Sequence, residues 1–146
     1  MNQQRPPRLV KLSAGRRSIL LVVAGIGWCL LATASRLEPD PRGFGTHEQL
    51  GLSPCWIIAR TGLPCPTCGM TTCWSLASRG RWAEAAACNG VGLLAFLATA
   101  LGSFSALVAS ALGRGPQISK PFELAAACGG ALVLALVLDW LRRLAV

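Results

Sequence analysis

The chain has 146 residues, of which 53% are hydrophobic and only 14% charged, and its mean hydropathy is +0.51. Charged residues make up about a quarter of an ordinary soluble domain, and a chain of this length has room for one domain. One small domain cannot bury so much apolar surface and still keep a polar exterior. The composition therefore argues against a soluble enzyme and predicts an all-α integral membrane protein.

The formal net charge is +8, but the cations are not gathered into a patch. Nine of the 14 stand in small groups before residue 18, between residues 113 and 121, and after residue 141, and the other five are spread over residues 36–81. Nucleic-acid binding needs clustered cations with polar or aromatic neighbours, whereas cations that flank apolar segments suit anionic lipid headgroups. The predicted partner is the lipid bilayer, and no nucleic-acid binding is expected.

The first apolar segment follows a basic tail. Residues 1–17 are polar and basic, and we expect a disordered cytoplasmic tail there. Residues 18–35 carry no charge and are long enough as a helix to cross the hydrocarbon layer, so they are predicted to form the first transmembrane helix. The alternative is a cleaved signal peptide, because Ala32-Thr33-Ala34 resembles a cleavage site. Both interpretations place the next segment outside the cytoplasm.

Residues 36–88 form the predicted extracytoplasmic loop, which is rich in cysteine. Up to residue 64 it is also rich in Pro and Gly, which predicts irregular chain with a short apolar turn at residues 56–58. Residues 70–79 have helical periodicity, with one face formed by Met70, Cys73, Trp74 and Ala77. We expect this short helix to be interfacial, lying on the membrane surface or dipping into it, because it is too short to span.

Two further apolar segments follow. Residues 85–113 carry no charge, which predicts the second transmembrane helix over 89–112. Its Gly, Ala and Ser residues suit close contact with other helices, including those of partner membrane proteins. A turn at 113–116 leads to a third predicted transmembrane helix over 122–141. Because cations are densest before the first span, we expect the amino terminus inside and the loop and carboxyl terminus outside.

Seven cysteines are present, an odd number, so they cannot all pair within one chain. Cys29 and Cys128 lie inside apolar segments and are expected to behave as small hydrophobic residues. Four others crowd into residues 55–73. Any chemistry of this chain is expected in that segment.

The motif Cys-Pro-Thr-Cys-Gly beginning at Cys65 has the form of a metal-binding turn. Two thiolates separated by two residues can bind one ion, and a small residue after the second lets the backbone bend. Tetrahedral zinc needs four ligands. Cys65 and Cys68 supply two, Cys55 and Cys73 could complete the set, and His47 is an outside candidate. Zinc or iron is the metal considered.

Two other interpretations of these thiols remain open. A Cys-x-x-Cys pair ahead of a helix gains thiolate stability, so Cys65 and Cys68 could exchange disulfides with Cys55 or Cys73 as partner. No histidine or carboxylate is clearly placed nearby as a base. The cysteines could instead form structural disulfides that staple the loop, which an oxidising compartment favours. A carrier of soft cations is a weaker alternative, because neither Cys29 nor Cys128 has a second thiol beside it.

Residues 61–71, Thr-Gly-Leu-Pro-Cys-Pro-Thr-Cys-Gly-Met-Thr, resemble a motif of small bacterial membrane proteins, the domain of unknown function 2752 family. Members of that family also have a Cys about ten residues upstream of this motif. Further along they have an Asn-Pro pair at the start of a long apolar helix. Cys55 and Asn89 match these positions, while Thr72 replaces an Arg and Gly90 the Pro. The resemblance covers roughly residues 52–112. It implies the bacterial cytoplasmic membrane and importance of the central cysteines, but no activity.

The resulting functional prediction is a multi-pass membrane protein that is a non-catalytic accessory or interaction subunit, with a thiol or metal site in its loop. The small-residue helix faces and the limited polar chemistry favour this role. The alternative is a membrane thiol-disulfide oxidoreductase that uses Cys65 and Cys68. The sequence specifies no substrate and no oligomeric state.

Overall fold

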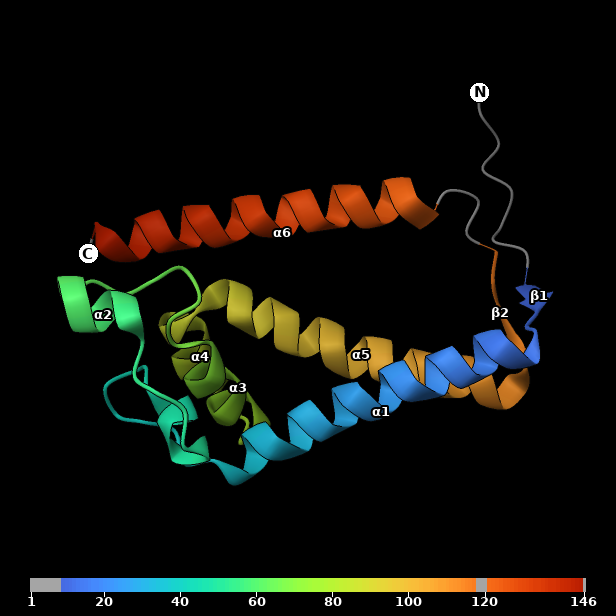
Figure 1. The fold of residues 1–146 in the computed structure, drawn as a ribbon, viewed down its shortest axis with the longest axis horizontal. Coiled ribbons are helices and arrows are strands. Elements are labelled where there is room, and N and C mark those ends of the chain that lie inside the picture. Colours follow the sequence, from blue (N-terminus) through green and yellow to red (C-terminus); the bar gives the residue numbers. More distant parts are fainter. Residues whose placement is uncertain (1–8, 118–120, 146) are drawn as a thin grey trace.

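A computed structural model of the chain describes residues 9–117 and 121–145 and is mostly helical (Figure 1). Two long helices lie side by side, a group of short helices gathers at one end of them, and a third long helix follows. In chain order the elements are β1 (Leu9–Lys11), α1 (Ala14–Arg36), the 3-10 helix η1 (Thr46–Leu50), α2 (Trp56–Thr61), α3 (Met70–Ser78), α4 (Trp82–Cys88), α5 (Gly90–Leu112), β2 (Arg114–Pro116) and α6 (Pro121–Leu144).

The long helices begin and end at residues suited to those positions. The Ser13 side chain accepts a hydrogen bond from the Arg16 backbone N–H at the start of α1, and Asn89 accepts one from Gly92 at the start of α5. Such caps satisfy backbone donors that have no partner within the helix. Gly113 ends α5 with a positive φ of 63°, a conformation that glycine adopts without strain.

Helices α1 and α5 make the main helix contact of the molecule. A Cβ atom at Gly27 would overlap the Ser103 side chain, so the absence of a side chain there lets the two backbones approach. Near the other end, Arg17 Nε donates to the Ser110 carbonyl at 2.9 Å, and Ser110 Oγ donates to the Arg17 carbonyl at 3.1 Å. Small residues and polar contacts thus hold this pair together.

Both helices are long and apolar enough to cross a membrane, as predicted for residues 18–35 and 89–112. Only 22% of the most apolar window of each is buried, whereas the core helix of a soluble protein is mostly buried. The two apolar helices therefore indicate a membrane protein. The third predicted span, residues 122–141, falls within the helix α6, and its crossing of a membrane stays a prediction.

The predicted disordered tail differs from the structure over its second half. Residues 1–8 lie outside the described part of the chain, but Leu9–Lys11 form β1, which pairs antiparallel with β2. Helix α1 begins at Ala14, before the predicted start. Backbone pairing explains the difference, because the Leu12 N–H also donates to the Gly113 carbonyl at 2.9 Å and joins the two chain segments.

The predicted loop is more ordered than its Pro and Gly content suggests. Helices η1 and α2 form within residues 36–64, where the sequence predicts irregular chain with a turn at 56–58. The helix expected over 70–79 is present as α3. It packs against α1, α4 and α5, and its residues Cys73, Leu76 and Ala77 form the core cluster together with Leu31 of α1, Ala85 of α4 and Phe96 of α5.

Trp74 packs against this core, and the more exposed Trp82 lies at its edge. The Trp74 and Trp82 rings meet the Phe96 ring edge-on, with centroids 5.8 Å and 6.2 Å away. Such edge-to-face pairs are favourable beyond the area they bury. They fix α3 and α4 to the first turns of α5, and so position the cysteine-rich segment at one end of the long helices. The carboxyl-terminal end of α6 lies at this same end (Figure 1).

Candidate functional site

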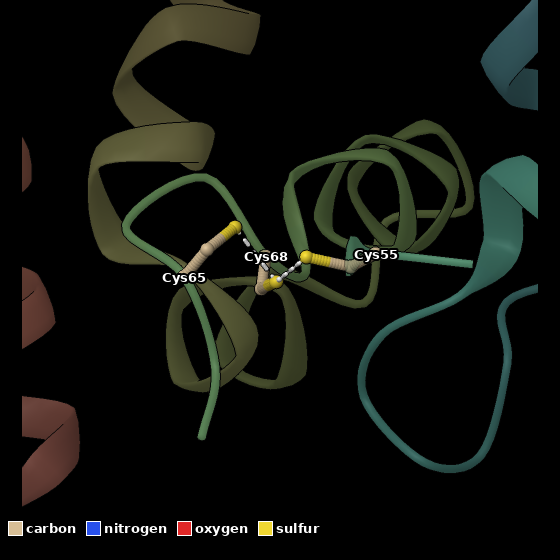
Figure 2. A group of neighbouring side chains, drawn as sticks. All are labelled: Cys55, Cys65 and Cys68. Carbon is tan, nitrogen blue, oxygen red and sulfur yellow. Dashed lines mark hydrogen bonds between the residues drawn. The ribbon is translucent and has the colours of Figure 1, made fainter. Parts of the chain in front are cut away.

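Three of the four predicted site cysteines converge on one point. The Sγ atoms of Cys55, Cys65 and Cys68 all lie within 4.8 Å of one another. Cys65 Sγ is 2.8 Å from Cys68 Sγ, which is 3.4 Å from Cys55 Sγ (Figure 2). All three are free thiols. Cys55 comes just before α2, and the other two occupy the turn before α3.

The turn at Cys65 is shaped by its own backbone and by a glycine. The Cys68 N–H donates to the Cys65 carbonyl at 3.1 Å, which closes the turn. Gly69 has a φ of +82°, and a Cβ there would lie 2.8 Å from the Gly43 carbonyl oxygen. Both the conformation and the close approach require glycine. The small residue after the second cysteine therefore has the role that the sequence predicts, which is to let the chain bend.

Cys73, the fourth predicted ligand, lies elsewhere. Its side chain is fully buried in the core of α3, and its thiol donates to the Asn89 carbonyl at 3.3 Å. It does not belong to the group formed by the other three cysteines. The physical reason is the helix itself: Cys73 sits on the first turn of α3 and faces α5, while Cys65 and Cys68 precede that helix.

A cavity of about 440 Å³ opens beside the three thiols. All three cysteines line it, together with His47, Met70 and Thr71 among others. His47, the outside candidate for a ligand, therefore shares the cavity, and its Nε2 lies 3.3 Å from the Ser53 carbonyl oxygen. Near its edge, Arg42 is paired with Asp40 at 2.7 Å and with Glu48 at 3.2 Å.

The thiols differ in acidity because their surroundings differ. Backbone N–H groups, chiefly that of Ile58, hold the pKa of Cys55 below its ordinary value. Burial raises the pKa of Cys68 to about 12, and burial raises that of Cys73 to about 12. Hydrogen bonding to a thiolate favours ionisation, whereas loss of water disfavours it. Cys55 is thus a better nucleophile at neutral pH than Cys68 or Cys73.

Side chains far away in the sequence hold the backbone of the cysteine turn. Sequence analysis identifies Asn89 only through the family resemblance, with no role at the turn, and misses Trp140 and Arg143, because Arg143 follows an apolar segment and has the pattern of a membrane-flanking cation. Their spacing carries no signal of this role, since a helix terminus brings them to the turn only in the folded chain. The donors are Asn89, Trp140 and Arg143, and the acceptors are the carbonyls of Pro64, Pro66 and Cys68.

The cluster is chemically suited to two kinds of reaction. Three thiolates can bind one soft cation, since sulfur ligands select zinc, copper(I) and iron. Neighbouring thiols can also form a disulfide and exchange it among themselves. Cys65 and Cys68 are close enough for a small movement to serve either purpose.

Residues 55–102 match the family model described as protein of unknown function (DUF2752). This match confirms the family resemblance over that segment, which contains the three clustered cysteines, α3, α4 and the first part of α5. It ends before α6. No curated protein and no solved structure matches the chain.

Proposed function

We propose that this chain is a multi-pass membrane protein in which Cys55, Cys65 and Cys68 hold one soft metal ion, zinc or iron. The observation that carries the proposal is the convergence of three free thiols on one cavity. Sulfur atoms that surround tetrahedral zinc lie about 3.7 Å apart, given zinc–sulfur bonds of about 2.3 Å. The observed 2.8 Å and 3.4 Å separations are near that spacing, so a small opening of the turn accommodates an ion.

The fourth position of such an ion would open on the cavity, because all three cysteines line it. His47 is our proposed fourth ligand, since it lines the same cavity and η1 carries it. Its ring nitrogens lie outside the 4.8 Å group of the three thiols, so η1 would move toward them when the ion binds. Imidazole nitrogen is an ordinary partner of thiolates in four-coordinate zinc sites. This arrangement replaces Cys73, whose thiol is turned into the core.

The role that we propose for the filled site is structural. A bound ion would fix α2 and the cysteine turn to one another and so form the docking surface of a non-catalytic accessory subunit. We further propose three spans, α1, α5 and α6, in a bacterial cytoplasmic membrane with the cysteine-rich segment outside. The apolar, largely exposed surfaces of these helices support their contact with lipid.

Elemental analysis of the full-length protein, purified in mild detergent and loaded with zinc, tests the metal site. We expect about one zinc per chain, lost in Cys65→Ser and Cys68→Ser and weakened in His47→Ala. Cys73→Ser should keep the metal, because its thiol lies outside the cluster. A wild-type zinc content no higher than that of the Cys55/Cys65/Cys68 triple serine variant would overturn the proposal.

A second candidate is thiol-disulfide exchange, favoured by the short Cys65–Cys68 contact and the acidic Cys55 thiol. The Cys55 thiolate would attack a disulfide of a partner protein, and one partner sulfur would leave as thiolate. The Cys68 thiol would then displace the second partner sulfur from Cys55 and give its proton to the leaving partner thiolate, so that two electrons pass to the partner. Attack by Cys65 on Cys68 would move the new disulfide to the Cys65–Cys68 pair and free Cys55.

Redox titration of the metal-free protein separates the two functions. An exchange pair that reduces partner disulfides should have a potential above the structural range, near the thioredoxin value of about −270 mV or higher, whereas a structural disulfide should lie below about −300 mV. Mass spectrometry after alkylation would identify the pair that titrates. A potential in the structural range would remove the exchange function.

A further inference from the structure

The backbone of the cysteine turn depends on donors from outside the turn. Pro64 and Pro66 have no N–H to offer. The turn closes on itself through the bonds from Cys68 N–H to the Cys65 carbonyl and from Met70 N–H to the Thr67 carbonyl, which leave the carbonyls of Pro64, Pro66 and Cys68 for other donors. Buried carbonyls that lack a donor cost free energy. Three carbonyls, those of Pro64, Pro66 and Cys68, are satisfied by side chains from α6 and from the start of α5.

Arg143 bonds two of these carbonyls, the same two as Asn89 but at shorter distances. Its two terminal nitrogens donate to the Cys68 carbonyl at 2.9 Å and to the Pro66 carbonyl at 2.8 Å. The Arg143 side chain is only 12% exposed, and its Nε lies 3.0 Å from Asp139 Oδ2, an ion pair whose geometry is not that of a hydrogen bond. A planar guanidinium held by a carboxylate presents its donors in a fixed fork. Hydrogen bonds from a charged donor are also stronger than those between neutral groups.

Two neutral donors assist the arginine. Trp140 Nε1 donates to the Pro64 carbonyl at 2.6 Å, and Asn89 Nδ2 donates to the Cys68 carbonyl at 3.2 Å. Trp140 and Arg143 belong to the last turns of α6, so this helix reaches the turn on both sides of Cys65. The positions of the Cys65 and Cys68 sulfur atoms follow from the backbone that these donors hold.

We infer that Arg143 is a positioning residue of the thiol site. Its two terminal nitrogens, bonded to the Pro66 and Cys68 carbonyls, set the spacing of the Cys65 and Cys68 sulfur atoms. The metal affinity of the site therefore depends on α6. The inference rests on the proposed metal site. It goes beyond that site because it assigns a role to a helix that lies outside the segment matched by the family model. Groups that orient metal ligands in this way commonly change metal affinity by about 10- to 100-fold when they are removed.

The test compares Arg143→Gln, Arg143→Lys and Arg142→Gln in the full-length protein in detergent. Arg142 is the matched control, since it neighbours Arg143 on the same helix, pairs with Asp139 and is 56% exposed. Zinc affinity is measured by competition with a chromophoric chelator. We expect Arg143→Gln to weaken zinc at least about tenfold and Arg142→Gln to change it less than twofold. Arg143→Lys keeps the charge but not the paired donors, and its zinc affinity should lie between those of the other two variants.

Two further measurements separate positioning from general stability. The cobalt(II) absorption spectrum reports ligand geometry, and it should change in Arg143→Gln but not in Arg142→Gln. In metal-free protein, the relative alkylation rates of Cys65 and Cys68 should change in Arg143→Gln as well. If Arg143→Gln does not fold, Arg143→Lys, which keeps the charge and removes the paired donors to Pro66 and Cys68, takes its place in both measurements.

The outcomes distinguish the two proposals. Equal zinc affinity and equal cobalt spectra for folded Arg143→Gln and Arg142→Gln would overturn the positioning role while leaving the metal site intact. A wild-type protein that binds no zinc would overturn the proposed function. In that case the alkylation rates decide the inference alone, and unchanged rates in Arg143→Gln would overturn it.

Discussion

At the scale of single residues, identical side chains acquire different chemistry from their surroundings. Cys55 lies where backbone N–H groups lower its pKa, whereas burial raises the pKa of Cys68. Cys73 is only five positions along from Cys68, yet it is a core residue whose thiol bonds the Asn89 carbonyl. Spacing in the sequence therefore identifies the cysteines that can act, but packing decides which of them meet, since Cys68 is buried beside two other thiols and Cys73 is buried outside that cluster.

The buried thiol of Cys73 gives a prediction about alkaline stability. Its folded pKa is about 12 against an ordinary value of 9.0, so the folded chain holds this proton more tightly than the unfolded chain. The corresponding stability is full below pH 9 and is lost as the pH rises toward 12. Cys73→Ser keeps a hydroxyl donor that does not ionise in this range. We expect its midpoint of thermal unfolding to fall less steeply than the wild-type midpoint between pH 9 and pH 11.

The comparison uses the slope of the unfolding midpoint against pH, because the substitution of Cys73 also changes core packing at every pH. Cys128→Ser is a suitable control, since Cys128 is exposed on α6 and should leave the slope unchanged. Equal slopes for wild type and Cys73→Ser would contradict the prediction. Cys68 contributes in the same direction and remains in both proteins, so the alkaline loss is expected to be reduced rather than removed.

At the scale of elements, Asn89 joins the start of a helix to the cysteine turn. Its Oδ1 accepts from the Gly92 N–H at 2.7 Å and caps α5, while its Nδ2 donates to the Cys68 carbonyl at 3.2 Å. Loss of such a cap costs about 0.5–2 kcal/mol. Serine can replace the cap, but its side chain is too short to reach the turn as well.

Asn89→Ser and Asn89→Ala therefore separate the two functions of this side chain. We expect Asn89→Ala to lower the free energy of unfolding by about 1 kcal/mol more than Asn89→Ser. Both should weaken zinc binding to a similar extent, since both lose the donor to Cys68. Thermal unfolding and chelator competition measure the two effects. A serine variant that restores zinc affinity would show that the cap, and not the amide donor, supports the site.

The α1–α5 contact gives a prediction with a built-in control. A side chain at Gly27 would collide with Ser103, whereas a Cβ at Gly25, on the same helix, meets nothing within 4 Å. Both substitutions to valine add the same volume to the same helix. Overfilling a packed contact costs about 1–3 kcal/mol, so Gly27→Val should lower the unfolding midpoint in detergent clearly more than Gly25→Val. Equal midpoints would mean that the two helices do not pack as described.

Much of this architecture is predictable from sequence, and the exceptions have a common cause. The absence of charge identifies α1 and α5, and helical periodicity identifies α3. Helices α2 and α4 are too short for such signals and depend on tertiary contacts, as the packing of Trp82 on Phe96 shows for α4. At the site, the motif predicts Cys65 and Cys68. The exclusion of Cys73 and the part played by Arg143 follow from packing, which no local pattern encodes.

At the scale of the whole molecule, the two ends of the long helices are built differently. One end carries the small β1–β2 sheet, and the other carries the short helices and the thiol cluster (Figure 1). The carboxyl-terminal end of α6 is fixed to the thiol end by Arg143 and Trp140. Whichever way the protein is inserted in a membrane, its cysteine turn and its carboxyl terminus should therefore lie on the same side.

Labelling in intact bacterial cells tests this arrangement. With a protease-cleavable tag after Val146, we expect an impermeant thiol reagent to label Cys55 under reducing conditions and an added protease to remove the tag. Cys55→Ser is the control for the labelled position, because Cys55 is more exposed than Cys65 and Cys68. Labelling and cleavage only after lysis would reverse the proposed orientation but keep the three spans. Labelling without cleavage, or cleavage without labelling, would mean that the cysteine turn and the carboxyl terminus lie on opposite sides of the membrane. That outcome would contradict the contact of α6 with the cysteine turn.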